Sequence, residues 1–336
     1  MLLQFPHTHT ARNGSIVLCG DVGATKTNLA LFSIDNDSYQ LLKEEQLVSN
    51  AYDHIAGLTH DFMQGAPQPN AVCFGVAGPV LKGHAKLSNL KWEIDISEIK
   101  TQFPQARVHL INDLEATAYG LAVLDEEDTE VIHPGSPSPE GNAAIIAPGT
   151  GLGEAGLYWD GSCFHPFATE GGHADFSARN PDDFNLYRYL QEQYGHVSWE
   201  RLVCGPGISN IYRYLRDIRK MEEPDWLAQK MLNADMPAVI SAHVEQSTLC
   251  NTTMQYFVRF LAQESANLVL KLNATGGLFI GGGIAPKITR LLNNNSFYTS
   301  YRQSGRLNFL LEKVPVKIIL NPKTALLGAA YYAATQ

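Results

Sequence analysis

The run IVLCGDVGATKTNLALFSI, residues 16–34, joins two apolar segments through a turn that contains Gly20 and Gly23. The first segment is continuously apolar, and in the second Leu29, Leu31 and Ile34 are spaced as one face of a strand. This pattern predicts a strand, a turn and a second strand. Glycines let backbone N–H groups converge on one point, so the turn is a candidate phosphate cradle. It is not a Walker loop, which needs four residues between its glycines, a Gly-Lys-Ser/Thr ending and a following helix.

A second run of the same plan, AAIIAPGTGLGEAGLY, occupies residues 143–158. Gly151, Gly153 and Gly156 match the dinucleotide fingerprint G-x-G-x-x-G, but that motif requires a helix to begin at this point. The sequence YWDGS at residues 158–162 instead indicates the end of a strand and a hairpin turn. An NAD-dependent oxidoreductase is therefore disfavoured. Two glycine hairpins at corresponding places predict two halves of similar plan that face one ligand.

Strand patterns alternate with helix patterns in both halves of the chain. The fold class that we predict is α/β, with a central cleft between a small and a larger domain. We expect a disordered tail at residues 1–14, a small domain formed by residues 15–112 and 321–336, and a large domain over residues 113–320. The tract 125–142 is rich in Pro, Glu, Ser and Gly and is predicted to be a surface loop.

Composition places the chain among ordinary globular proteins. Its 336 residues favour two domains, and a net charge of −9 argues against a nucleic-acid or anionic-membrane partner. The five cysteines are scattered and include no C-x-x-C pair, which disfavours structural zinc and a disulfide framework and fits a reducing compartment. No membrane span or signal peptide is recognisable. We expect a cytoplasmic protein.

Asn112 and Asp113 lie where a predicted strand ends and a helix begins. Asn112 with Glu115 has the spacing of a capping box, which is a purely structural interpretation. The carboxyl ends of strands are also where ligands bind in open α/β sheets, and Asp113 there could accept a proton from an attacking hydroxyl. One residue pair can serve both purposes.

Three further segments contain polar or glycine residues of interest. Glu170-Gly171-Gly172-His173 suits hydrogen bonds to a polyol, although an acidic surface loop, or a metal site of His165, His173 and Asp175, are alternatives. Ser198-Trp199-Glu200 fits a helix N-cap with an acid in the first turn. Gly281, Gly282 and Gly283 follow a buried strand and either form a turn or let a flat purine approach the backbone.

Seven motifs together resemble the bacterial glucokinases, a family of the hexokinase and actin-like ATPase superfamily. They are, in family order, GDVGATKT, SNLKW, INDLEAT, APGTGLG, EGGHADF, SWERLVCGPG and LFIGGGIAPK, and they cover the chain from about residue 16 to its end. The resemblance implies the two-lobed, ribonuclease H-like fold of that superfamily. It also implies phosphorylation of the 6-hydroxyl of D-glucose with ATP and Mg²⁺, and commonly a homodimer.

Residue roles follow from the resemblance position by position. Asp113 matches the catalytic base. The sugar ligands would be Asn89, Asn112, Asp113, Glu170, His173 and Glu200. The two phosphate loops and the adenosine site would comprise Asp21, Gly23, Ala24, Thr25, Gly149, Thr150, Gly151, Gly281, Gly282 and Gly283, with Asp21 near Mg²⁺ through water.

Two positions of the first loop depart from the family pattern. Ala24 stands where relatives usually have Gly, and Asn28 stands where they usually have Arg. Ala24 would be strained if its φ were positive, and Asn28 removes a cation. The cysteine-rich zinc motif of the related repressor and kinase superfamily is absent, so no zinc is expected. The alternatives that stay open are a kinase for mannose, fructose or an amino sugar, and a non-catalytic sugar sensor, which would carry a DNA-binding domain before residue 16.

Overall fold

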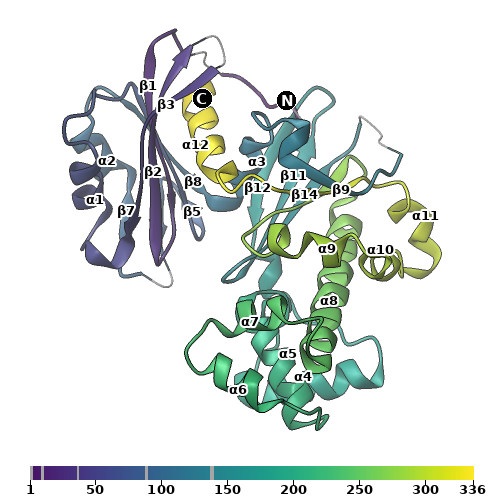
Figure 1. The fold of residues 1–336 in the computed structure, drawn as a ribbon. Coiled ribbons are helices and arrows are strands. Elements are labelled where there is room, and N and C mark those ends of the chain that lie inside the picture. The colour runs from purple at the N-terminus through teal and green to yellow at the C-terminus, as the bar shows by residue number, and fades with distance from the viewer. Residues whose placement is uncertain (1–2, 9–10, 36–37, 88–89, 137–139) are drawn as a thin grey trace. The chain divides into compact units, whose positions relative to one another are not determined.

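The computed structural model describes residues 3–8, 11–35, 38–87, 90–136 and 140–336 (Figure 1). The chain divides into two compact units. Unit 1 comprises Met1–Asp128, Leu157–Ala168 and Asn321–Gln336, and unit 2 comprises Thr129–Gly156 and Thr169–Leu320. The predicted domain boundaries stay a prediction. Among the described residues, no helix has the length and apolarity needed to cross a membrane.

Unit 1 is built on a five-stranded sheet in the order β3-β2-β1-β4-β8. β1 is antiparallel to β2 and parallel to β4, and β4 is parallel to β8. Helices α1 and α2 lie on one side of this sheet and α3 and α12 on the other (Figure 1). The elements are β1 Ser15–Val22, β2 Lys26–Asp35, β3 Ser38–Val48, α1 Ile55–Phe62, β4 Ala71–Val76, α2 Ile96–Gln102, β8 Arg107–Asn112, α3 Asp113–Gly120 and α12 Thr324–Thr335.

Alternation along β1 produces two cores, one on each face of the sheet. Leu18 and Val22 pack in the core that includes α1, while Val17 and Cys19 pack in the core that includes α12. On the latter face α12 and α3 approach closely, because a Cβ on Gly328 would lie 1.7 Å from the carbonyl oxygen of Ala116. The small-residue character of α12 therefore allows two helix backbones to contact each other beside the sheet.

The segment expected to be a disordered tail is packed in its described part. Phe5 is only 4% exposed and lies against Tyr119, Phe164 and Tyr331, and the amide of Phe164 donates to the carbonyl of Gln4. Residues 3–8 thus differ from the expectation. The sequence around Phe5 is polar, and its partners come from distant parts of unit 1, so no local pattern indicated this packing.

The second sheet has the order β12-β11-β10-β13-β14-β9. Here β10, β13 and β14 are parallel and β9 is antiparallel to β14. Apart from β9, the order repeats that of the first sheet, with β10, β11 and β12 in the places of β1, β2 and β3. The prediction of two halves of similar plan is confirmed. The strands are β9 Thr129–His133, β10 Ala143–Pro148, β11 Leu152–Trp159, β12 Phe164–Thr169, β13 Gly277–Ile280 and β14 Val316–Ile319.

The helices of unit 2 surround the long helix α8, whose residues contribute much of the largest hydrophobic core. They are α4 Pro181–Tyr194, α5 Gly205–Asp217, α6 Asp225–Met231, α7 Met236–Ala242, α8 Thr248–Leu272, α9 Thr289–Leu292, α10 Asn295–Tyr301 and α11 Asn308–Leu311. Short 3₁₀ helices are η1 Ser49–Ala51, η2 Glu126–Asp128, η3 Gly171–His173, η4 Trp199–Arg201, η5 Ala285–Ile288 and η6 Gly305–Leu307.

Several elements were not expected from the sequence. The tract 125–142 contains β9 and is not entirely loop, because its residues pair with β14 at the edge of the sheet. A three-stranded sheet in unit 1, formed by β5 Val80–Leu81, β6 His84–Lys86 and β7 Glu93–Asp95, also lacks a clear apolar pattern. These elements are short or lie at edges, where few side chains are buried and periodicity is weak.

Candidate functional site

Asp113 is the first residue of α3, and a complete capping box fixes this helix start. Asn112 Oδ1 accepts from the backbone N–H of Leu114 at 2.8 Å and of Glu115 at 3.4 Å, and Glu115 Oε2 accepts from the Asn112 N–H at 3.1 Å. Asp113 Oδ1 accepts from the same Leu114 N–H at 2.9 Å. The structural interpretation of Asn112 is therefore confirmed. The positive end of the helix also favours an ionised carboxylate at Asp113.

Asp21 and Asp113 lie on either side of Gly75 within unit 1. In the parallel pairing of β1 with β4, Asp21 is the partner of Gly75, and a Cβ on Gly75 would lie 3.7 Å from Cα of Asp113. The ends of β1, β4 and β8 are at one edge of the sheet because all three strands are parallel. This edge brings together the residue predicted near Mg²⁺ and the predicted base.

The turn between β1 and β2 is braced by Ser49. Its hydroxyl donates to the carbonyl of Gly23 at 2.7 Å, and its N–H donates to the carbonyl of Thr25 at 3.1 Å. Among the described residues the non-glycine positions with positive φ are Lys82, Lys220 and Asn273, so Ala24 is not in that region. The departure from glycine at position 24 thus carries no backbone strain.

Asn28 lies beside Asp21, its register partner across the hairpin. Asn28 Nδ2 donates to Asp21 Oδ2 at 3.4 Å, and Asn28 Oδ1 accepts from Gln46 at 2.8 Å. Burial raises the pKa of Asp21, and the hydrogen bond from Asn28 opposes that effect only in part. A neutral amide thus occupies the place of the family's usual cation, and a bound cation at Asp21 would meet no positive side chain from residue 28.

In unit 2 the turn between β10 and β11 is held by Glu200, which is 31% exposed. Glu200 Oε2 accepts from the Leu152 N–H at 2.8 Å, and a Cβ on Gly151 would lie 2.5 Å from this oxygen. The Gly149 N–H donates to the carbonyl of Gly151, which closes the turn. β11 continues from Leu152 as a strand, so the predicted absence of a helix after the G-x-G-x-x-G match is confirmed.

The segment 170–173 lies next to Glu200. Trp199 N–H donates to the carbonyl of Ala174 at 3.0 Å, and His173 Nδ1 lies 4.0 Å from Glu200 Oε1. Glu170 and His173 are at least partly exposed, and η4 begins without a side-chain cap from Ser198. The capping interpretation of residues 198–200 is therefore wrong, because Glu200 instead binds the neighbouring turn. The predicted ligand Asn89 lies outside the described residues.

The remaining metal alternative, His165 with His173 and Asp175, is not supported. Each of the three has a different partner. His165 Nε2 lies 2.7 Å from Asp160 Oδ2, His173 is next to Glu200, and Asp175 Oδ1 lies 2.9 Å from His196 Nε2.

The contact between Gly151 and Glu200 yields a test. Gly151→Ala places a methyl group within 2.5 Å of Glu200 Oε2 and must displace that carboxylate. If Glu200 binds the sugar, loss of a hydrogen bond to a charged group worth about 1.5–3 kcal/mol should raise the KM for glucose by roughly 10- to 100-fold. Steady-state kinetics measure it. Gly149→Ala, whose added methyl meets no atom within 4 Å, should change the glucose KM less than about threefold. Equal effects of both variants would contradict the assignment of Glu200.

A pocket of about 650 Å³ adjoins the second glycine turn, entirely within unit 2. Its lining includes Gly149, Thr150, Gly205, Ser209, Arg213, Gly283 and Lys287. A Cβ added to Gly283 would meet no atom within 4 Å, whereas Gly282 has φ +75° and a Cβ there would lie 2.4 Å from the carbonyl oxygen of Pro148. Gly282 thus shapes the turn and Gly283 leaves space. Gly281 donates its N–H to the carbonyl of Ile146.

Arg213 and Lys287 are site candidates that sequence reasoning missed. Both line the pocket that contains Thr150, and cations suit the phosphates of a nucleotide. Lys287 ends the motif LFIGGGIAPK and follows the glycine turn by four residues, so its place in that motif was an available signal. Arg213 lies in the third turn of α5 and had no comparable signal.

Glu154 is a buried acid beneath the segment 170–173. It is 1% exposed, and among the described side chains no donor reaches its Oε1. A Cβ on Gly171 would lie 2.0 Å from its Oε2. Burial, together with the nearby carboxylate of Glu264, raises the pKa of Glu154 to about 8. This acid is therefore neutral at pH 7 and supports the segment that carries Glu170 and His173.

Comparisons with known proteins agree on one family. The Glucokinase family model matches residues 18–336. A glucokinase of Nostoc punctiforme is 39% identical, over 95% of this chain and 99% of its own length. Among solved structures, a glucokinase from an Antarctic psychrotroph has a TM-score of 0.81 at 28% identity, covering 96% of this chain and 99% of that one.

A more distant structure has the same fold. A ROK family glucokinase from Streptomyces griseus, solved in complex with glucose and AMPPNP, has a TM-score of 0.65 at 18% identity, with 95% of this chain and 99% of that chain covered. The predicted α/β fold of the sugar kinases is thereby confirmed. Because the family model and the Nostoc relative each match nearly the full length, this chain belongs to the glucokinase family.

Proposed function

We propose that this enzyme transfers the γ-phosphoryl group of ATP to the 6-hydroxyl of D-glucose, with Asp113 as the general base. The observation that carries the assignment of the base is the position of Asp113 at the start of α3, beside Asp21 at the ends of β1, β4 and β8. Membership of the glucokinase family supports the reaction, and the Streptomyces griseus relative was solved with glucose and AMPPNP.

The geometry at Asp113 suits proton abstraction. One carboxylate oxygen accepts from the Leu114 N–H, which holds the side chain in place. The helix start stabilises the anion, so the group is ready to accept the proton of the sugar hydroxyl as that oxygen attacks phosphorus. A positioned base is worth typically 10²–10⁴-fold, or about 3–5 kcal/mol. Orientation of the two substrates and charge stabilisation must supply the rest of the acceleration.

The nucleotide is assigned to the pocket of unit 2 and the two glycine turns. Gly149, Thr150 and Gly283 line this pocket with the cations Arg213 and Lys287. The carboxylate of Asp21 is a hard oxygen donor of the kind that Mg²⁺ prefers, and Asn28 leaves it without a competing cation. When bound with the nucleotide, Mg²⁺ would neutralise charge that develops on the phosphates.

The sugar is assigned to polar side chains from both units. In unit 2, Glu200 and His173 lie near each other and Glu170 is partly exposed on the same short segment. In unit 1, Asn112 donates to the carbonyl of Gly78 at 3.0 Å, which leaves its second N–H hydrogen for a ligand. Asn89 completes the proposed set. Carboxylates that accept from hydroxyls would be left unpaired by deoxy sugars, which should be poor substrates.

Two further properties are proposed with the reaction. We place the enzyme in the cytoplasm, where the free cysteines of the chain stay reduced. We also propose a homodimer, as is common in the family.

A coupled assay of ADP release tests the proposed reaction. ATP and Mg²⁺ are supplied with glucose, mannose, fructose, an amino sugar or 2-deoxyglucose, each over a range of concentrations. We expect glucose to have the highest kcat/KM and 2-deoxyglucose to be reduced at least about tenfold, because an unpaired buried acceptor costs about 1–3 kcal/mol. A higher kcat/KM for another hexose would transfer the assignment to that sugar, and ADP release that ignores every sugar would contradict it.

A further inference from the structure

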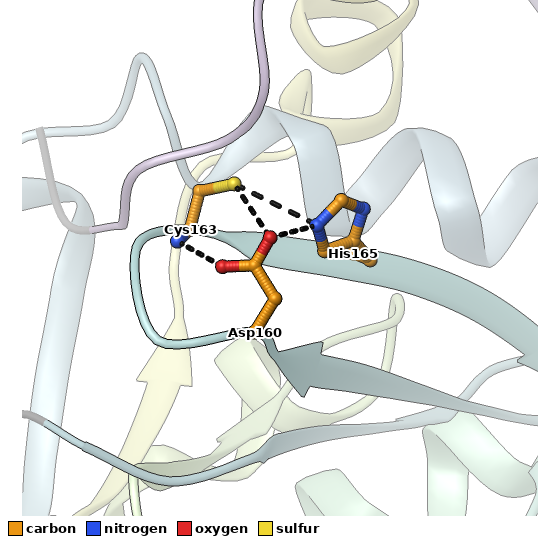
Figure 2. A group of neighbouring side chains, drawn as sticks. All are labelled: Asp160, Cys163 and His165. Carbon is orange, nitrogen blue, oxygen red and sulfur yellow. Dashed lines mark hydrogen bonds and ion pairs between the residues drawn. The ribbon is translucent and has the colours of Figure 1, made fainter.

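The turn between β11 and β12 places three potential metal ligands around one point, and none of them has a role in the proposed reaction. Figure 2 shows Asp160, Cys163 and His165 facing one another. Asp160 Oδ2 lies 2.7 Å from His165 Nε2 and 3.6 Å from Cys163 Sγ, and Cys163 Sγ lies 3.7 Å from His165 Nε2. All three residues belong to unit 1.

The turn itself orients the carboxylate of Asp160. Its Oδ1 accepts from the backbone N–H groups of Ser162 at 2.8 Å and Cys163 at 2.9 Å, and from the Ser162 hydroxyl at 2.8 Å. The Asp160 N–H donates to the carbonyl of Cys163 at 3.2 Å, which closes the turn. Oδ2 is therefore left to face the thiol and the imidazole, and the arrangement does not depend on a bound ion.

A nucleophilic Cys-His-Asp triad is excluded by the atoms involved. In such a triad one ring nitrogen of histidine faces the nucleophile and the other faces the carboxylate. Here both the thiol and the carboxylate approach the same atom, Nε2 of His165, and the other ring nitrogen points away (Figure 2). Three donor atoms that converge on one another in this way match a metal site, in which each ligand contributes one atom to a common centre.

The distances can be compared with those of tetrahedral zinc. Zn–S bonds of about 2.3 Å and Zn–N or Zn–O bonds of about 2.0–2.1 Å imply separations of about 3.5 Å between sulfur and either lighter atom, and about 3.3 Å between nitrogen and oxygen. The two sulfur separations, 3.6 and 3.7 Å, already agree. The hydrogen-bonded pair at 2.7 Å must open by about 0.6 Å, which partly exposed side chains can do when the ion replaces the shared proton.

We propose that Asp160, Cys163 and His165 bind one Zn²⁺ ion, with water in the fourth position. A thiolate, an imidazole and a carboxylate together suit zinc and do not suit Mg²⁺, which prefers oxygen ligands. The expectation of no zinc rested on the missing C-x-x-C pair and cysteine-rich motif. The spacing D-x-x-C-x-H belongs to neither pattern, and its significance depends on the hairpin turn. Binding would release the thiol proton and tie β11 to β12.

Cobalt spectroscopy and zinc titration of the untagged full-length protein test the proposal. The other cysteines, Cys19, Cys73, Cys204 and Cys250, are buried, so a thiolate-to-cobalt charge-transfer band would report on Cys163. We expect one Co²⁺ per chain with this band, and its loss on addition of one equivalent of Zn²⁺. Excess Mg²⁺ should not displace either metal.

Variants connect the signal to the three residues. Cys163→Ser should abolish the cobalt band and weaken zinc binding by at least about 100-fold, since loss of a mere outer-shell partner already costs 10- to 100-fold. His165→Gln should weaken zinc binding similarly. The control is His196→Gln, which removes an exposed histidine that is also paired with an aspartate, and it should leave both signals unchanged.

Two results would overturn the site. Stoichiometric zinc binding that survives in both Cys163→Ser and His165→Gln would place the ion elsewhere. Absence of the charge-transfer band in the wild-type protein at saturating cobalt would show that Cys163 is no ligand. Because the readouts are metal binding and not phosphoryl transfer, neither depends on the assignment of Asp113.

Discussion

Asp113→Asn should lower kcat by about 10²- to 10⁴-fold, an increase of about 3–5 kcal/mol in the activation barrier. The amide has nearly the shape of the carboxylate but cannot accept the proton of the sugar hydroxyl. Its oxygen can still accept from the Leu114 N–H, so the start of α3 should be preserved. Steady-state kinetics with glucose and ATP-Mg²⁺ measure the loss, and the KM for glucose should change little.

Asp113→Ala separates the proton acceptor from the helix cap. The Leu114 N–H is also accepted by Asn112 Oδ1 at 2.8 Å, so removal of the Asp113 side chain leaves that donor paired. We expect turnover to be abolished while glucose binding, followed by calorimetry, remains measurable. If either variant kept a kcat within a few-fold of the wild type, Asp113 would not be the base.

Glu154→Gln should stabilise the folded protein at pH 7 and above. The pKa of Glu154 is raised from 4.5 to about 8, mainly by burial and then by Glu264. Below pH 4.5 the acid is protonated in both states and has no effect. Between 4.5 and 8 only the unfolded state releases the proton, so the free energy of unfolding falls as pH rises. The cost reaches on the order of 3 kcal/mol near pH 7, and glutamine, which cannot ionise, should remove most of it.

Denaturant unfolding of both proteins between pH 5 and pH 8 measures this effect. The stability of Glu154→Gln should exceed that of the wild type increasingly as pH rises, and the two should converge toward pH 5. The exposed residue Glu192 provides a matched control, because Glu192→Gln should alter stability by less than about 0.5 kcal/mol at every pH. A constant difference between Glu154→Gln and wild type across the pH range would show that Glu154 ionises normally.

Much of the fold was predictable because the two glycine hairpins carry strong local signals. The strand before each turn is apolar, the turn is marked by glycine, and the strand after it leaves no room for a helix. Alternation within β1 even separates the two cores, with Val17 and Cys19 on one face and Leu18 and Val22 on the other. The edge strand β9 was missed because its residues are at most partly buried and its pairing with β14 is far along the chain.

The candidate site was predictable in residue type more than in interaction. Asp113 and its capping box followed from spacing alone. The role of Glu200 did not, because its bond to the Leu152 N–H joins segments that are distant in sequence. Glu154 was hidden inside the glycine motif, where only the burial of β11 reveals an ionisable group whose Oε1 has no donor among the described side chains. Sequence patterns report local periodicity, whereas these contacts arise from tertiary packing.

Single-turnover phosphoryl transfer tests the central assignment most directly. Enzyme in excess over γ-labelled ATP is mixed with saturating glucose, quenched at short times, and assayed for labelled glucose 6-phosphate. We expect the wild-type protein to form this product, and Asp113→Asn to form it at least about 100-fold more slowly at unchanged glucose affinity. Equal rates of product formation in the two proteins would contradict the account.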